Sequence, residues 1–220
     1  MTRVDVALEK GDRRAFAIAL EWPGWARSGK TEEEALERLA QYASRYAKVA
    51  KESALSEAVT FEVVERLDGG SGTDFGVPGS EAKADRRPLS AADAKRHDTL
   101  LQAAWGAFDQ AARRARGRKL TTGPRGGGRD VDKMTIHVLE AEEAYLHQLG
   151  RRRPKMADAS VDGRMKEVRR LALETLAVVR RGEEPPETNK VKKRWPPRYH
   201  VRRSAWHALD HAWEIEDRLG

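Results

Sequence analysis

The sequence predicts two folds in one chain: a small α+β domain with the order strand, strand, helix, strand, followed by an all-α up-and-down four-helix bundle. Short alternating or apolar segments, typical of strands, fall before residue 68, whereas four long segments with helical periodicity fall after residue 88. Between them, residues 68–88 are rich in Gly, Ser, Pro and charge, which is typical of a linker. We therefore expect domains at 1–67 and 89–220.

The N-terminal elements follow from apolar patterning and turn chemistry. Residues 3–9 and 14–21 have strand length, and the Lys-Gly-Asp sequence at 10–12 suits a hairpin turn between them. A threonine followed three residues later by a glutamate forms a capping box at the start of a helix predicted over 31–50. A third strand is expected over 59–67. We predict that the strands pair in antiparallel fashion.

Four helices are expected in the second half, at 90–117, 131–149, 161–181 and 198–219. Their apolar residues recur at helical spacing, and Ser, Gly and Pro near their ends are typical start and stop signals. A glycine-rich loop, GPRGGGRD at 123–130, precedes the second helix. Four helices of this length with two longer connections are typical of a bundle.

Charge and composition limit the classes of function. Residues 1–84 hold 12 Lys/Arg against 15 Asp/Glu, whereas residues 85–220 hold 30 against 20. A basic half suits nucleic-acid binding, but acidic residues are interleaved through most of it, which favours solvated helix faces. Nucleic acid is therefore the lowest-ranked partner. No apolar run could span a bilayer and the N-terminus lacks a signal-peptide pattern, so we expect no membrane contact and a cytoplasmic location.

The sequence WHALDH at 206–211 is the motif most indicative of chemistry. His207 and His211 are four residues apart, so on a helix they lie one turn apart on one face and could bind a single cation. A third ligand must come from another helix, and His137 is the candidate. The alternative is that these are surface-edge histidines, hydrogen-bonded to carboxylates such as Asp210.

A helical wheel of the last helix places the histidines on the border opposite its apolar arc, in a stripe that also contains His200 and Glu214. This position predicts that they face a cleft rather than the deepest core, as an accessible metal site with open coordination positions requires. His147 is expected to be exposed, and His97 and His200 are interpreted as residues without a role in the site, with a place for His200 along the cleft as the alternative.

The segment AFAIALEWPGWARSGKTEEEALERLAQYA resembles the HicB-like fold. In that fold a hairpin strand ends in a Pro-x-x-Gly-type turn, and a Gly-x-Thr step leads into a helix rich in Glu and Ala. The resemblance covers residues 3–67 and implies either an antitoxin that blocks a small RNase or an appended module. No ribbon-helix-helix or helix-turn-helix segment follows it here, so we interpret it as an accessory domain.

The C-terminal half, from about residue 90, resembles the DinB-like (YfiT-like) metal-binding four-helix bundle family. IHVLEAEEAYLHQLG matches the family's second helix and WHALDHAWEIEDRL its fourth. The resemblance implies that His137, His207 and His211 hold one divalent metal, with Zn first and Ni, Fe and Mn as alternatives. It also implies a transferase or isomerase that uses a low-molecular-weight thiol. Since the chain has no cysteine, such a thiol must come from a small molecule.

Other residues complete this first hypothesis. Asp210 and Glu214 are candidates to orient an imidazole or relay a proton, and Arg125 and Arg129 of the glycine-rich loop are candidates to bind an anionic group of a small-molecule substrate or cofactor. The loop lacks the Gly-Lys-Ser/Thr ending of a Walker A motif, which argues against an NTPase.

The second hypothesis is a non-catalytic binding or stress-response module in which the HicB-like domain docks a protein partner. Oligomeric state is left open by the sequence, with a homodimer as one option.

Overall fold

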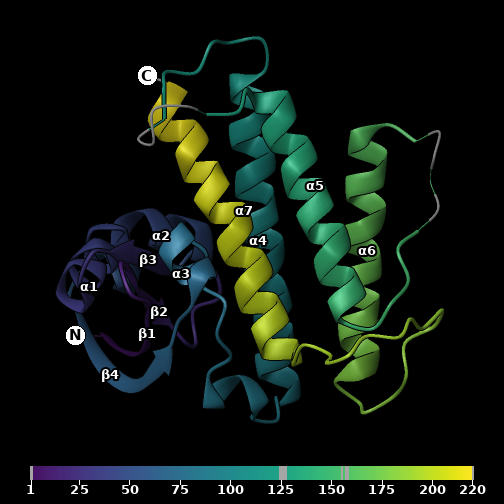
Figure 1. Ribbon diagram of the computed structural model, residues 1–220, viewed down its shortest axis with the longest axis horizontal. Coiled ribbons are helices and arrows are strands. Elements are labelled where there is room, and N and C mark those ends of the chain that lie inside the picture. Colours follow the sequence, from purple (N-terminus) through teal and green to yellow (C-terminus); the bar gives the residue numbers. More distant parts are fainter. Residues whose placement is uncertain (1, 124–127, 155, 157–158, 220) are drawn as a thin grey trace.

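The N-terminal part of the protein is a four-stranded sheet with short helices packed around it (Figure 1). The computed structural model describes residues 2–123, 128–154, 156 and 159–219. The sheet has the order β3-β2-β1-β4. Its strands have the following bounds: β1 Thr2–Lys10, β2 Ala15–Ala19, β3 Ala26–Gly29 and β4 Val59–Asp68. The expected α+β class is confirmed.

The prediction of purely antiparallel pairing is wrong for β4. β1 pairs antiparallel with β2, and β2 with β3, but β4 runs parallel to β1. The reason is the helical crossover between β3 and β4, formed by α1 (Glu32–Gln41) and α2 (Ala43–Ala50). A crossover of this length returns the chain to the same end of the sheet, as parallel pairing requires.

Two local features of the sheet domain also differ from the prediction. The segment ARSG forms β3, which the sequence did not predict because it is four residues long and lacks β-branched or aromatic residues. The single helix expected over 31–50 is divided into α1 and α2 at Tyr42. The ring of Tyr42 packs on Trp213 of the last helix, with centroids 5.0 Å apart. Half of the predicted capping box is present: Thr31 Oγ1 accepts from Glu34 N at 3.2 Å, but Glu34 Oε2 accepts from Lys30 N, at 2.9 Å, and not from the N-cap residue Thr31.

Residues 68–88, interpreted as a linker, contain the short helices α3 (Ser71–Phe75) and η2 (Lys83–Arg86). The buried Glu9 carboxylate of β1 accepts hydrogen bonds from this segment, from Thr73 Oγ1 at 2.6 Å and from two backbone amides. A buried bidentate pair joins Asp85 to Arg202 of the last helix. The segment therefore packs against both the sheet and the helical part, and the domain division at 67 and 89 stays a prediction.

The C-terminal part consists of four long helices packed together, as predicted. They are α4 Ala91–Ala115, α5 Val131–Gln148, α6 Val161–Val179 and α7 Pro197–Leu219. α4 and α7 lie between the sheet on one side and α5 and α6 on the other (Figure 1). Ser90, Asp130 and Ser160 each cap a helix by accepting a backbone N–H, which explains why these helices begin where the sequence predicts. Within the described ranges, no helix is both long and apolar enough to cross a membrane.

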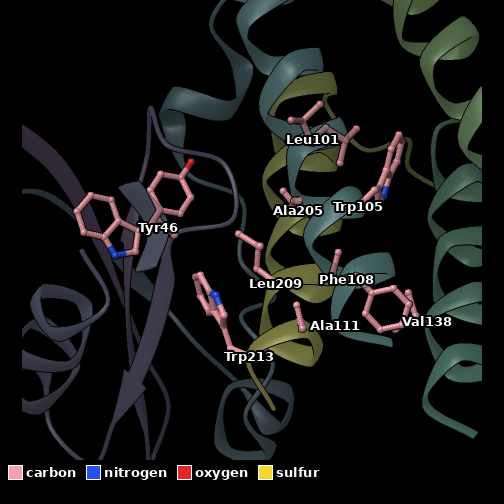
Figure 2. Packing of buried hydrophobic residues seen from close by; sticks show 14 of the residues in the cluster. Tyr46, Leu101, Trp105, Phe108, Ala111, Val138, Ala205, Leu209 and Trp213 are labelled. Atoms are coloured by element: carbon pink, nitrogen blue, oxygen red, sulfur yellow. The ribbon is translucent and has the colours of Figure 1, made fainter. Parts of the chain in front are cut away.

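One hydrophobic core joins the sheet to the helices, and α7 is at its centre. Leu209 and Trp213 of α7 point toward Tyr46 on the sheet side, whereas Phe108 of α4 lies on the side of α5 (Figure 2). Almost every residue of α7 from 199 to 213 is buried. The helical wheel predicted one buried and one exposed face for this helix, but neighbouring elements cover its polar face as well. This burial brings the histidines of α7 inside the molecule.

Candidate metal centre

Three histidines from two helices meet in the interior of the helical part. His137 projects from α5, and His207 and His211 project from α7. One ring nitrogen of each lies within 4.8 Å of the others. The ring centroids of His137 lie 5.1 Å from those of both α7 histidines, which are themselves 4.7 Å apart. His207 and His211 are buried, and His137 is half-buried. The structure thus brings together the three residues that the sequence proposed as ligands.

The spacing of the nitrogens suits a common metal ligand set. Nε2 of His137 and Nε2 of His207 are 3.3 Å apart. With Zn–N bonds of about 2.0–2.1 Å in a tetrahedral site, two nitrogens bound to one ion lie roughly 3.3–3.4 Å apart. The same separation also fits a weak hydrogen bond between two imidazoles, so the distance is compatible with metal binding without requiring it. The donor set, three imidazoles and no protein anion, resembles that of a catalytic rather than a closed structural site.

His211 is oriented by a carboxylate. Its Nδ1 lies 3.1 Å from Glu214 Oε2, and because a carboxylate only accepts, Nδ1 carries the proton and Nε2 is left to bind a metal. Glu214 in turn accepts from Arg218 Nη1 at 2.8 Å. Arg218 also donates through Nε to the carbonyl of Thr121, at 2.8 Å. A chain of polar contacts therefore connects His211 to the segment that follows α4.

His207 is held by packing instead of by a carboxylate. Its ring makes edge contacts with Tyr145, at 5.8 Å between centroids, and lies against Trp206. Its Nδ1 is buried and has no hydrogen-bond partner among the described residues. His207 and His211 therefore differ in how they are fixed, although they lie one turn apart on the same helix.

The environment favours the neutral, metal-binding form of His137 and His207. Burial lowers the pKa of His137 to about 4, and the neighbouring His211 and Arg129 contribute in the same direction. Burial also lowers the pKa of His207 well below its ordinary value, with His211 and Arg203 adding to the shift. A metal competes with protons for imidazole nitrogens, so residues that resist protonation are ready to bind one at neutral pH.

A cavity of about 380 Å³ opens beside His211. It lies between the sheet, α7 and the described residues Gly123, Gly128 and Arg129 before α5. Its walls are formed by residues from all three: Arg27, Tyr42, Gly123, Gly128, Arg129, Asp210, His211, Trp213, Glu214, Asp217 and Arg218. The expected cleft is present for His211, whereas His137 and His207 are not among the residues that line it. One of its walls comes from the N-terminal part of the chain, which the sequence did not indicate.

The remaining predicted site residues are placed as follows. Asp210 lines the cavity and its Oδ1 accepts from Arg27 Nη1 at 2.7 Å, so its described charge partner is this arginine. Glu214 is the carboxylate that contacts an imidazole. Arg129 is exposed and lines the cavity. Arg125 lies outside the described residues.

The other histidines stay apart from the cluster. His97 is buried in α4, and burial lowers its pKa to about 4. His200 is buried beside Ser204, and burial lowers its pKa to about 3. His147, which was expected to be exposed, is half-buried near the end of α5.

Neither a protein-family model, nor a curated protein, nor a solved structure matches this chain. The resemblances to HicB-like and DinB-like proteins therefore rest on the sequence motifs alone, and the candidate site rests on its own geometry.

Proposed function

We propose that the protein binds one divalent metal ion through His137, His207 and His211 and is a metal-dependent enzyme acting on a small molecule in the adjoining cavity. The observation that supports this most strongly is the convergence of three largely buried imidazoles from two helices within 4.8 Å. Three imidazole nitrogens held this close together can share one bound ion, which supplies a common partner to all three.

The chemistry follows from the donor set. Three neutral imidazoles add no charge, so a bound divalent ion would keep its full charge and lower the pKa of a water or thiol brought to it. A low-molecular-weight thiol is the proposed co-substrate, as the DinB-like resemblance implies, because the chain has no cysteine of its own. Zn²⁺ is the first candidate metal, with Ni, Fe and Mn as alternatives that the ligand types also accept.

The residues around the cluster have distinct roles in this proposal. Glu214 holds the proton of His211 Nδ1 and so fixes the tautomer that presents Nε2. The rings of Tyr145 and Trp206 exclude water from His207. The cavity beside His211 receives the substrate, and Arg129 at its wall attracts an anionic one.

Elemental analysis of the untagged protein tests the proposal. We expect a near-stoichiometric divalent metal in the wild type and its loss in His207→Ala, with the circular dichroism spectrum retained. His147→Ala is the matched control, since His147 also lies in α5 but does not belong to the cluster. Wild-type protein that lacks metal and takes up no added Zn²⁺, Ni²⁺ or Mn²⁺ would refute the proposal. Unchanged metal content in His207→Ala would refute the ligand assignment.

A further inference from the structure

We infer that Arg27, a residue of the sheet domain, is the group that binds a carboxylate of the substrate in the cavity beside His211. This inference rests on the proposed function, because it names the substrate class for that same site. It gives the N-terminal domain a part in recognition: the domain forms one wall of the cavity and supplies the residue that selects what enters it.

The position of Arg27 is fixed by contacts with both parts of the chain. Its guanidinium carbon lies 3.7 Å from the ring centroid of Tyr42 and 4.3 Å from that of Trp213. Its Nη1 donates to Asp210 Oδ1 at 2.7 Å. The side chain is only 12% exposed. A guanidinium packed on two rings and held at one nitrogen loses little further conformational freedom when a ligand binds, as a pre-organised site requires.

One edge of this guanidinium has no hydrogen-bond partner among the described residues. Nε and Nη2 of Arg27 are buried and make no hydrogen bond to any described residue. The same edge is used elsewhere in this protein to bind carboxylates with two parallel bonds: Arg202 binds Asp85 in this way, and Arg169 binds Glu142. A planar carboxylate is the group that matches the Nε–Nη2 edge, so the buried, unpaired edge of Arg27 indicates this ligand chemistry.

The unpaired edge identifies a site only together with the cavity. Arg180 also leaves Nε and Nη2 without a described partner, and an unpartnered edge alone is therefore not specific. Arg27 differs because it lines the cavity that His211 also lines. The two observations are independent: one concerns the hydrogen bonds of a single side chain, and the other concerns the space between three segments.

The charges of the cavity wall do not oppose an anion. Each acidic residue in the wall is already neutralised by an arginine: Asp210 by Arg27, Glu214 by Arg218 and Asp217 by Arg45. Arg129 lines the same cavity and pairs with no described carboxylate. The three arginines and three carboxylates of the wall therefore balance before any metal is bound, and a carboxylate entering the cavity meets no uncompensated negative charge.

The test uses the protein loaded with Co²⁺ and two series of small thiols of matched length. Mercaptoalkanoates with one to five methylene groups carry the carboxylate, and mercaptoalkanols of the same length lack it. Binding is followed by the change in the visible absorption of Co²⁺. At the best chain length, we expect the wild type to bind the mercaptoalkanoate about tenfold or more tightly than the mercaptoalkanol of the same length. A charge-assisted pair of hydrogen bonds implies a difference of this size.

Arg27→Lys is the decisive variant, since it retains a positive charge but lacks the two-pronged edge. We expect it to lose most of the carboxylate preference while its affinity for mercaptoalkanols and its cobalt content stay unchanged. Arg14→Lys is the matched control, because Arg14 precedes β2 in the same sheet and is not part of the cavity wall. An equal preference in wild type and Arg27→Lys would overturn the inference. An equal preference for mercaptoalkanesulfonates would overturn the assignment to carboxylates.

A second readout keeps this inference separate from the proposed function. If the wild type binds no metal, the proposed function fails, but Arg27 can still be examined in the metal-free protein by the NMR signal of its Nε–H group. We expect this signal, assigned by its loss in Arg27→Lys, to shift on addition of glutarate and not on addition of 1,5-pentanediol. The absence of a shift with glutarate would overturn the inference.

Discussion

At the scale of single residues, Glu214 has the most informative position beside the cluster. It accepts the proton of His211 Nδ1 and an N–H of Arg218, and the hydrogen bond from His211 lowers the pKa of Glu214. We expect Glu214→Gln to weaken metal affinity about 10- to 100-fold, because an amide can present N–H to Nδ1 and no longer fixes the tautomer. Competition with a chelating dye for Zn²⁺ measures this affinity.

Glu216→Gln is the control for that measurement. Glu216 lies two residues further along α7, is exposed, and binds Arg45 rather than a histidine. We expect its metal affinity to equal that of the wild type. Equal affinities in Glu214→Gln and wild type would show that the contact with His211 is incidental.

The sequence was a good guide to the histidines and a poor guide to Arg27. Two histidines four apart on a helix lie on one face whatever surrounds them, so His207 and His211 could be paired from spacing alone. Arg27 lies in a four-residue strand that has no strand signal, and its partners Asp210 and Trp213 are more than 180 residues away in the chain. No local pattern encodes such a contact, because it depends on how the sheet packs on α7.

At the scale of elements, the turn between β2 and β3 fixes how the sheet meets α7. Gly24 has a φ of 97°, and a Cβ there would lie 2.8 Å from Leu209 Cδ1 and 3.2 Å from Ala205. We expect Gly24→Ala to lower the free energy of unfolding by about 2–4 kcal/mol, because it combines an unfavourable φ with a collision against α7. Urea denaturation followed by circular dichroism measures the change.

Gly182→Ala separates the two contributions. Gly182 also has a positive φ, 76°, but a Cβ there would meet open space. We expect it to cost only about 1 kcal/mol, the part due to backbone conformation alone. Equal losses in the two variants would mean that the turn does not press on α7 as closely as the contact distances indicate.

Elements with strong local signals were predicted well, and those decided by pairing were not. The four long helices begin at Ser90, Asp130, Ser160 and Pro197, where a side-chain cap or a proline marks the start. β3 and the parallel direction of β4 depend on neighbours in the sheet. Partly buried and exposed residues alternate along β4, as in a strand with one face toward solvent. This alternation is the same whether the strand pairs parallel or antiparallel.

At the scale of the whole molecule, the cavity exists only because the sheet and the helices share one core. Residues of β1, β2, α1 and α2 belong to the same buried cluster as those of α4 to α7. The domain division drawn from the sequence placed a linker at 68–88, but Asp85 in this segment forms a buried bidentate pair with Arg202 of α7. Two parts joined in this way are expected to unfold together rather than independently.

Hydrogen exchange at increasing urea concentration tests this. We expect amides of β1 and β2 to lose protection at the same urea concentration as amides of α7, because neither part keeps its core without the other. Leu209→Ala sharpens the comparison: Leu209 is fully buried, and its truncation should lower the free energy of unfolding by about 2–5 kcal/mol. In a single cooperative unit, that loss lowers by the same amount the urea concentration at which the sheet amides and the α7 amides lose protection. If instead the sheet amides kept their wild-type midpoint while those of α7 shifted, the two parts would be independent domains, and a cavity built from both would have to form by docking.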